Sequence, residues 1–180
     1  MFRNSITGAV VFSIFMLAVF TATCGKKEPG YFRDRAKGFS VVFPDDWEIK
    51  TEGLLGATVV QALGPLEEKG DLFRENVNIS VENLSKDVGL QYYREMTFDN
   101  IAKALSEFRE TERTEFTLDG RKAVMTVFTH RAGALRLKVL LCLVVERHRG
   151  YVLVCTATEK SYPAFKETFF KIMRSLKLEG

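Results

Sequence analysis

The strongest indication of the fold comes from the segment Leu135-Arg-Leu-Lys-Val-Leu-Leu-Cys-Leu-Val-Val-Glu146. All of its odd-numbered positions are apolar, which is the alternation of a β-strand with one buried face. Its even-numbered positions are charged at both ends but apolar in the middle, at Leu140, Cys142 and Val144. Because the centre is apolar on both sides, we expect this strand to lie in a sheet that is covered on both faces.

Two amphipathic segments can supply that cover, one before this strand and one after it. Residues 90–108 carry apolar side chains three and four positions apart, the spacing of one helix face. A second helix is expected to begin at Tyr162-Pro163, since proline is well tolerated in the first helical turn. The sequence therefore predicts an α+β fold in which a sheet is sandwiched between helices (α/β/α).

The remaining strands are expected to form an antiparallel sheet. Alternating or β-branched stretches predict strands over residues 38–43, 47–50, 57–63 and 76–82 before the first helix. Strands over 111–118, 121–130 and 151–158 are predicted after it. Asp119-Gly120 is a strong signal for a two-residue hairpin turn, because both turn positions need positive φ.

Two cysteines lie in the last predicted hairpin. If Arg147 pairs with Gly150, Cys142 falls opposite Cys155. Directly opposite residues lie about 4.5–5.5 Å apart, a separation that a disulfide can sometimes bridge. The alternative, which we favour, is two buried free thiols that act as small apolar side chains.

The start of the chain has the features of an export signal. Arg3 is followed by an uncharged apolar run over residues 9–20 and by small residues just before Cys24. This pattern resembles a bacterial lipoprotein signal, in which the cysteine becomes the first mature residue and carries acyl chains. Two alternatives are ordinary cleavage of a secreted domain and an uncut membrane helix, since residues 6–23 approach the ~20 residues of a membrane span.

The predicted organisation follows from that signal. Residues 1–23 are the signal peptide, Cys24 is the lipidation site, 24–37 form a polar tether and 38–178 form one domain. Removing the signal leaves 157 residues, enough for a domain that buries around 70% of its unfolded surface. The resemblance also implies a place in the bacterial envelope, at the outer membrane facing the periplasm rather than at the inner membrane, because Gly25 and not aspartate follows the cysteine.

The domain itself resembles the PsbP and DcrB-like lipoproteins. The similar stretches are Gly38-Phe-Ser-Val-Val-Phe-Pro-Asp-Asp-Trp47, Leu118-Asp-Gly-Arg-Lys-Ala123, and the closing pair Tyr151–Thr158 and Phe169–Leu176. The resemblance implies an α/β/α sandwich around an antiparallel sheet. It also implies a binding or accessory role, and no functional residues carry over because the group shares no catalytic motif.

No combination of residues in the sequence predicts catalysis, a metal site or a cofactor. His130 and His148, the two histidines, have no suitably spaced carboxylates, and no glycine-rich phosphate loop occurs. We therefore expect a protein that is not an enzyme. The net charge of +3 is too small for a dedicated nucleic-acid binder.

One end of the predicted sheet is basic. Two interpretations are open: contact with anionic lipid headgroups or an acidic protein, and a solvated sheet edge that basic side chains protect from unwanted pairing. We favour the second. The residues concerned are His130, Arg131, Arg136 and Lys138, with Arg121 and Lys122 at the far end of the neighbouring strand.

The predicted function is that of a membrane-anchored envelope lipoprotein. Its domain would act as a non-catalytic binding or accessory module for another envelope protein. The alternative is a small-ligand carrier or an envelope enzyme, which needs an apolar pocket between sheet and helix. The residues expected near such a pocket are Tyr92, Tyr93, Tyr151 and Thr156.

Overall fold

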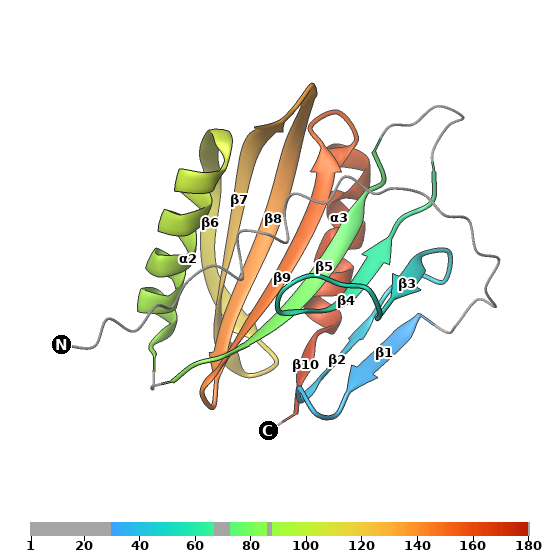
Figure 1. Cartoon of the computed structure of the whole chain (residues 1–180). Helices are drawn as coiled ribbons and strands as arrows, with labels where there is room; N and C mark the ends of the chain where they lie inside the picture. Colours follow the sequence, from blue (N-terminus) through green and yellow to red (C-terminus); the bar gives the residue numbers. More distant parts are fainter. Residues whose placement is uncertain (1–29, 67–72, 86–87, 180) are drawn as a thin grey trace.

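The computed structural model describes residues 30–66, 73–85 and 88–179 (Figure 1). The segment that contains Cys24 lies outside these residues. The described chain forms two antiparallel sheets, one of seven strands in the order β3-β4-β5-β9-β8-β7-β6 and one of three in the order β1-β2-β10. No described helix is both long and apolar enough to cross a membrane.

The elements are β1 (Tyr31–Asp34), β2 (Phe39–Val42), β3 (Glu48–Lys50), β4 (Thr58–Leu63), β5 (Asn76–Asn83), α2 (Leu90–Ala104), β6 (Ser106–Leu118), β7 (Arg121–Ala132), β8 (Leu135–Glu146), β9 (Arg149–Thr158), α3 (Tyr162–Ser175) and β10 (Lys177–Leu178).

Strand β8 is buried on both faces, as its sequence predicts. Its odd-numbered residues, including Leu141 and Leu143, belong to a core cluster with Ile101 of α2. Its even-numbered residues, including Leu140, belong to a second cluster with Phe169 of α3. The two helices therefore cover opposite faces of the large sheet (Figure 1). Each fully buried leucine or phenylalanine contributes about 1.5–3 kcal/mol relative to an exposed one, so both layers stabilise the sheet.

The first helix is shorter than predicted. It ends at Ala104, Leu105 is already extended, and Phe108 lies in β6 rather than on the helix. The helical spacing of Phe108 was misleading, because its ring still packs in the same layer, 5.1 Å from the centroid of Phe128 and 6.4 Å from that of Phe98.

The predicted tether is also shorter than expected. From Tyr31 onward its residues form β1, which pairs with β2 through the register Tyr31↔Val42. Gly38, with φ of 72°, makes the turn between these strands. The sequence of this segment is too polar to predict a strand. Backbone hydrogen bonds to β2 and the packing of the Phe32 ring against the core hold it to the domain.

The predicted register of the last hairpin is wrong by two residues. Glu146, not Arg147, makes the last pair, and the two turn residues Arg147 and His148 both have positive φ. As a result Cys142 lies opposite Leu153 rather than Cys155. Both cysteines are free and buried, and burial raises the pKa of the Cys142 thiol to about 12.

Candidate functional site

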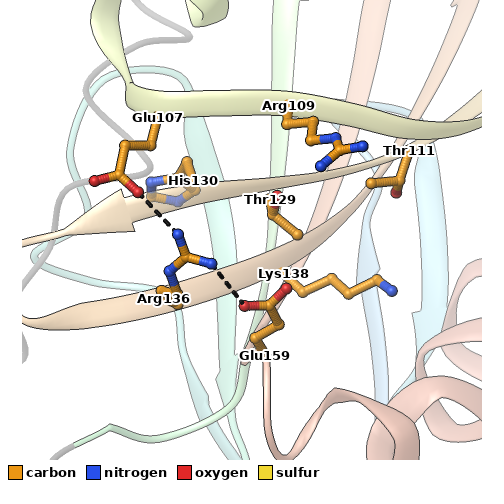
Figure 2. A pocket seen from close by; sticks show the side chains of 8 residues that line it. All are labelled: Glu107, Arg109, Thr111, Thr129, His130, Arg136, Lys138 and Glu159. Carbon is orange, nitrogen blue, oxygen red and sulfur yellow. Dashed lines mark hydrogen bonds and ion pairs between the residues drawn. The ribbon is translucent and has the colours of Figure 1, made fainter.

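A polar pocket of about 220 Å³ lies at one end of the large sheet, over the strands β6, β7 and β8 (Figure 2). It is formed by side chains from three neighbouring strands and by one residue that directly follows β9. The lining residues are Glu107, Arg109, Thr111, Thr129, His130, Arg136, Lys138 and Glu159.

Strand pairing places three of these residues in one row. Arg109 of β6 pairs with Thr129 of β7, and Thr129 pairs with Lys138 of β8. Directly paired residues point to the same face, and adjacent strands lie about 4.8 Å apart. A short threonine therefore separates two long cationic side chains, which leaves space above Thr129.

Irregular pairing in β6 brings Arg109 into this row. The register shifts between Ser106 and Arg109, and again between Glu110 and Glu112. Such bulges re-aim side chains at the edge of a sheet. Glu107 lies inside the first shift with φ of 53°, and its carboxylate reaches back across the neighbouring strands.

Glu107 holds two arginines at the rim of the pocket. Its carboxylate lies 3.1 Å from the guanidinium of Arg131 and 3.1 Å from that of Arg136. Arg136 also reaches Glu159 at 3.8 Å, and Figure 2 shows Arg136 between the two carboxylates. Hydrogen bonds from Arg131 and Arg136 hold the pKa of Glu107 below its usual range, so this side chain is anionic at neutral pH.

Arg109 and Lys138 are not neutralised in this way. Among the described residues, no carboxylate lies within ion-pair distance of either side chain. The Lys138 ammonium instead lies 4.8 Å from the ring centroid of Tyr162. Both side chains extend away from Arg136 (Figure 2), so neither cation is held in an ion pair with a described carboxylate.

His130 is not part of an exposed basic surface, although its sequence position suggested this. Its side chain is only 2% exposed, and its ring lies 6.2 Å from that of Phe128. Neither ring nitrogen has a hydrogen-bond partner in the described part of the chain. Burial lowers the pKa of His130, so the ring is neutral at pH 7 and adds no charge to the pocket.

The predicted basic end of the sheet therefore divides into two places. Arg136 and Lys138 line the pocket, and Arg131 pairs with Glu107 of its lining. Arg121 lies at the far end of β7 and pairs with Asp119 at 3.0 Å. Sequence reasoning missed Glu107, Arg109 and Glu159. Glu107 and Arg109 were missed because the helix was predicted to run to Phe108 and the next strand to begin only at Thr111.

The residues expected around an apolar pocket do not gather at one cavity. Tyr92 is exposed, whereas Tyr93 and Tyr151 belong to the clusters on opposite faces of the sheet. The hydroxyl of Tyr93 donates to Glu82 at 2.8 Å, and that of Tyr151 donates to the Lys37 carbonyl at 3.0 Å. This part of the alternative prediction is wrong. Residues 30–66, 73–85 and 88–179 also contain no group of three or more His, Cys, Asp or Glu side chains that could hold a metal ion.

Comparison with known proteins identifies the fold as PsbP-like. No family model matches the chain, and no curated protein sequence matches it significantly. Among solved structures, it is similar to cyanobacterial PsbP (CyanoP) from Synechocystis sp. PCC 6803, with a TM-score of 0.63 and 16% identity over 87% of this chain and 98% of that protein.

Two further structures share the fold. LpqN of Mycobacterium tuberculosis, described as involved in cell envelope biogenesis, matches with a TM-score of 0.61 and 13% identity over 79% of this chain and 83% of that one. PA94 of Pseudomonas aeruginosa, described as a putative regulator of unknown function, matches with a TM-score of 0.58 and 17% identity over 81% of this chain and 93% of that one. At these identities the similarity establishes the α/β/α architecture predicted from the sequence, and establishes only that.

Proposed function

We propose that this protein is a lipoprotein of the bacterial cell envelope, anchored through Cys24, whose PsbP-like domain acts as a non-catalytic binding or accessory module for another envelope protein. The observation that carries the proposal is the packing of both faces of the large sheet. With its interior filled by its own side chains, the domain meets other molecules through its surface.

The packing is tight on both sides. Phe128 and Leu143 of the sheet, on the side of α2, are 0% exposed, and so are Leu140 of the sheet and Phe169 of α3 on the other side. Ligand carriers usually enclose their ligand in an apolar cavity of several hundred Å³. Within the described residues, the polar pocket beside Arg109 is a place where a small ligand could bind instead.

The location rests on two supports. Residues 1–23 resemble a lipoprotein signal peptide that is cut just before Cys24, and the structurally similar LpqN is described as involved in cell envelope biogenesis. Two or more acyl chains hold a protein firmly to a bilayer, because each buried methylene adds about 0.8 kcal/mol. We place the domain in the periplasm at the outer membrane, since Gly25 follows the cysteine.

The anchor is tested by the intact mass of the protein extracted from membranes, beside a Cys24→Ala variant. We expect a chain that begins at residue 24 and carries acyl chains, and we expect the variant to lose them. An unmodified chain, or one that keeps Met1, would contradict the anchor.

The accessory role is tested by photo-crosslinking in intact cells. A photoreactive residue is placed at one exposed site at a time: Thr111 on β6, Glu95 on α2 and Val42 on β2. A protein partner predicts one discrete crosslinked product from one of these surfaces and none from the others. The absence of a discrete product at all three surfaces would contradict the proposal.

A further inference from the structure

We infer that the polar pocket binds a phosphate monoester, with the phosphate held above Thr129 between Arg109 and Lys138. This inference goes beyond the proposed function, because it concerns a ligand of the domain itself and not its protein partner. The ligand is the phosphate group of a small molecule or of a lipid headgroup, since both present the same chemistry to the pocket.

The charge of the pocket selects a dianion. Arg131 and Arg136 share Glu107, and Arg136 also pairs with Glu159. Arg109 and Lys138 are left with two positive charges. A phosphate monoester carries close to two negative charges at neutral pH, so it neutralises both. A phosphodiester or a single carboxylate would leave one cation uncompensated.

The spacing of the row fits a tetrahedral anion. Three adjacent strands place the Cα atoms of Arg109 and Lys138 roughly 10 Å apart, and their side chains extend to the same side (Figure 2). Arginine binds phosphate through two parallel N–H donors, and lysine binds it as a point charge. Both can reach one phosphate that sits above the short side chain between them.

The threonines fit the same arrangement. The Thr111 hydroxyl already donates to the Val127 carbonyl at 3.1 Å. The Thr129 hydroxyl has no hydrogen-bond partner among the described residues, and it lies in the middle of the row. It is therefore available to donate to the phosphate.

Protection of a sheet edge does not explain these cations fully. Charged side chains on β6 are expected, since β6 is the last strand of the described sheet. Lys138, however, lies on β8, which has β7 on one side and β9 on the other. A lysine on an interior strand protects no edge, and its contact with the Tyr162 ring leaves its positive charge without a carboxylate partner.

The pocket is large enough for the headgroup only. Its volume of about 220 Å³ is below the ≈ 300–1,000 Å³ of pockets that enclose a drug-sized ligand. The remainder of the ligand would project into solvent or toward a bilayer. Glu107 and Glu159 at the rim would repel additional negative charge.

The test is calorimetric titration of the full chain in detergent micelles with glycerol 3-phosphate, at near-neutral pH. We expect saturable binding that Arg109→Gln and Lys138→Gln each weaken by at least about tenfold, as loss of one charge-assisted contact predicts. The matched control is Lys122→Gln, an exposed lysine at the other end of β7, which removes the same charge and should leave the affinity unchanged. Thermal unfolding of each variant checks that the fold is intact.

Two soluble short-chain lipids identify the source of the phosphate. Dihexanoyl phosphatidic acid is a monoester, and dihexanoyl phosphatidylglycerol is the diester control. Tighter binding of the phosphatidic acid than of glycerol 3-phosphate indicates a lipid headgroup, and equal binding indicates a free phosphate. No binding of either monoester, equal binding of the diester, or unchanged affinity in both glutamine variants overturns the inference. None of these results alters the mass or crosslinking expected for the proposed function.

Discussion

The phenol ring of Tyr93, on α2, lies directly against the backbone of Gly150, on β9. A methyl group added at Gly150 would overlap the ring, and would lie within 2.8 Å of its Cε1 atom. Gly150 pairs with Val145 of β8 and with Glu82 of β5. The close approach of the Tyr93 ring therefore requires a glycine at this position of β9.

We predict that Gly150→Ala destabilises the domain by roughly 1–3 kcal/mol, the usual effect of forcing an extra carbon into a packed site. Urea unfolding of the two proteins measures the difference. Gly89→Ala is the matched control, because a Cβ at Gly89 meets no atom within 4 Å. Equal losses for both alanine variants would show that the Tyr93 contact is not the cause.

The hydrogen bond from Tyr93 to Glu82 makes a pH-dependent prediction. Burial raises the pKa of Glu82, and the hydrogen bond from Tyr93 opposes that rise. A raised carboxyl pKa contributes stability in the protonated state, which is lost as pH rises through the folded-state pKa. Tyr93→Phe removes the hydrogen-bond donor. The free energy of unfolding therefore decreases mainly when the Glu82 carboxylate is charged.

We therefore expect Tyr93→Phe to lose roughly 1–3 kcal/mol at pH 7 and clearly less near pH 4, where Glu82 is largely protonated. Urea unfolding at the two pH values measures this. Tyr151→Phe is the control: its hydroxyl donates to the uncharged Lys37 carbonyl, so its cost of about 1 kcal/mol should not depend on pH. The same pH dependence in both variants would contradict the explanation.

The core of the fold could be predicted from the sequence because its signals are local. The alternation of apolar residues in 135–146, with an apolar centre on both sides, predicts β8 and both of its buried faces without knowledge of any other segment. Asp119-Gly120 gives the turn between β6 and β7, where both residues have positive φ. The small sheet could not be predicted in the same way. Its strands β1 and β10 are short and polar, and backbone pairing with β2 defines them.

The candidate site depends on register, which a single strand does not encode. Arg136 and Lys138 were identified because they share one strand face. Arg109 is added to them only by the register shift between Glu110 and Glu112, which places it opposite Thr129. The same reason explains the cysteines: the choice of Arg147 and His148 as turn residues decides which side chain lies opposite Cys142.

Asp119 joins the C-terminus to the hairpin of β6 and β7. Its carboxylate accepts a hydrogen bond from the Leu178 backbone N–H at 2.9 Å, and it lies 3.2 Å from the Lys177 ammonium. Burial alone would raise the pKa of Asp119, but this hydrogen bond and the charges of Lys177 and Arg121 bring it below its usual value. The ionised carboxylate therefore stabilises the attachment of β10.

We predict that Asp119→Asn, which removes the charge but still suits the positive φ of this turn, loses about 1 kcal/mol at pH 7 and speeds hydrogen exchange at the Leu178 amide. Because the pKa is lowered, the contribution of Asp119 is complete above its unfolded value and is lost as pH falls below about 4. Hydrogen exchange by mass spectrometry measures the release of β10. The control, Asp99→Asn on the exposed side of α2, should change neither quantity. Unchanged exchange at Leu178 would contradict a role for Asp119 in holding this strand.

The last prediction concerns Glu107, which competes with any anion for the cations of the pocket. Glu107→Gln removes a negative charge beside the proposed phosphate and releases Arg131 and Arg136 from their shared partner. We expect glycerol 3-phosphate to bind about two- to fivefold more tightly, the change that a screened charge several ångströms away produces. The same calorimetric titration measures it.

The matched control is Glu115→Gln. Glu115 lies on the same strand and is exposed, but it pairs with Val124. Val124 pairs in turn with Leu143, which packs on the α2 side of the sheet, so Glu115 points away from the pocket. Its removal changes the net charge equally and should leave the affinity within twofold of the wild type, since exposed charges beyond about 10 Å are largely screened in salt. If both variants raise the affinity alike, the ligand responds to net charge alone. If Glu107→Gln weakens binding, its carboxylate positions the arginines for the ligand instead of competing with it, and the two-cation assignment to Arg109 and Lys138 is wrong.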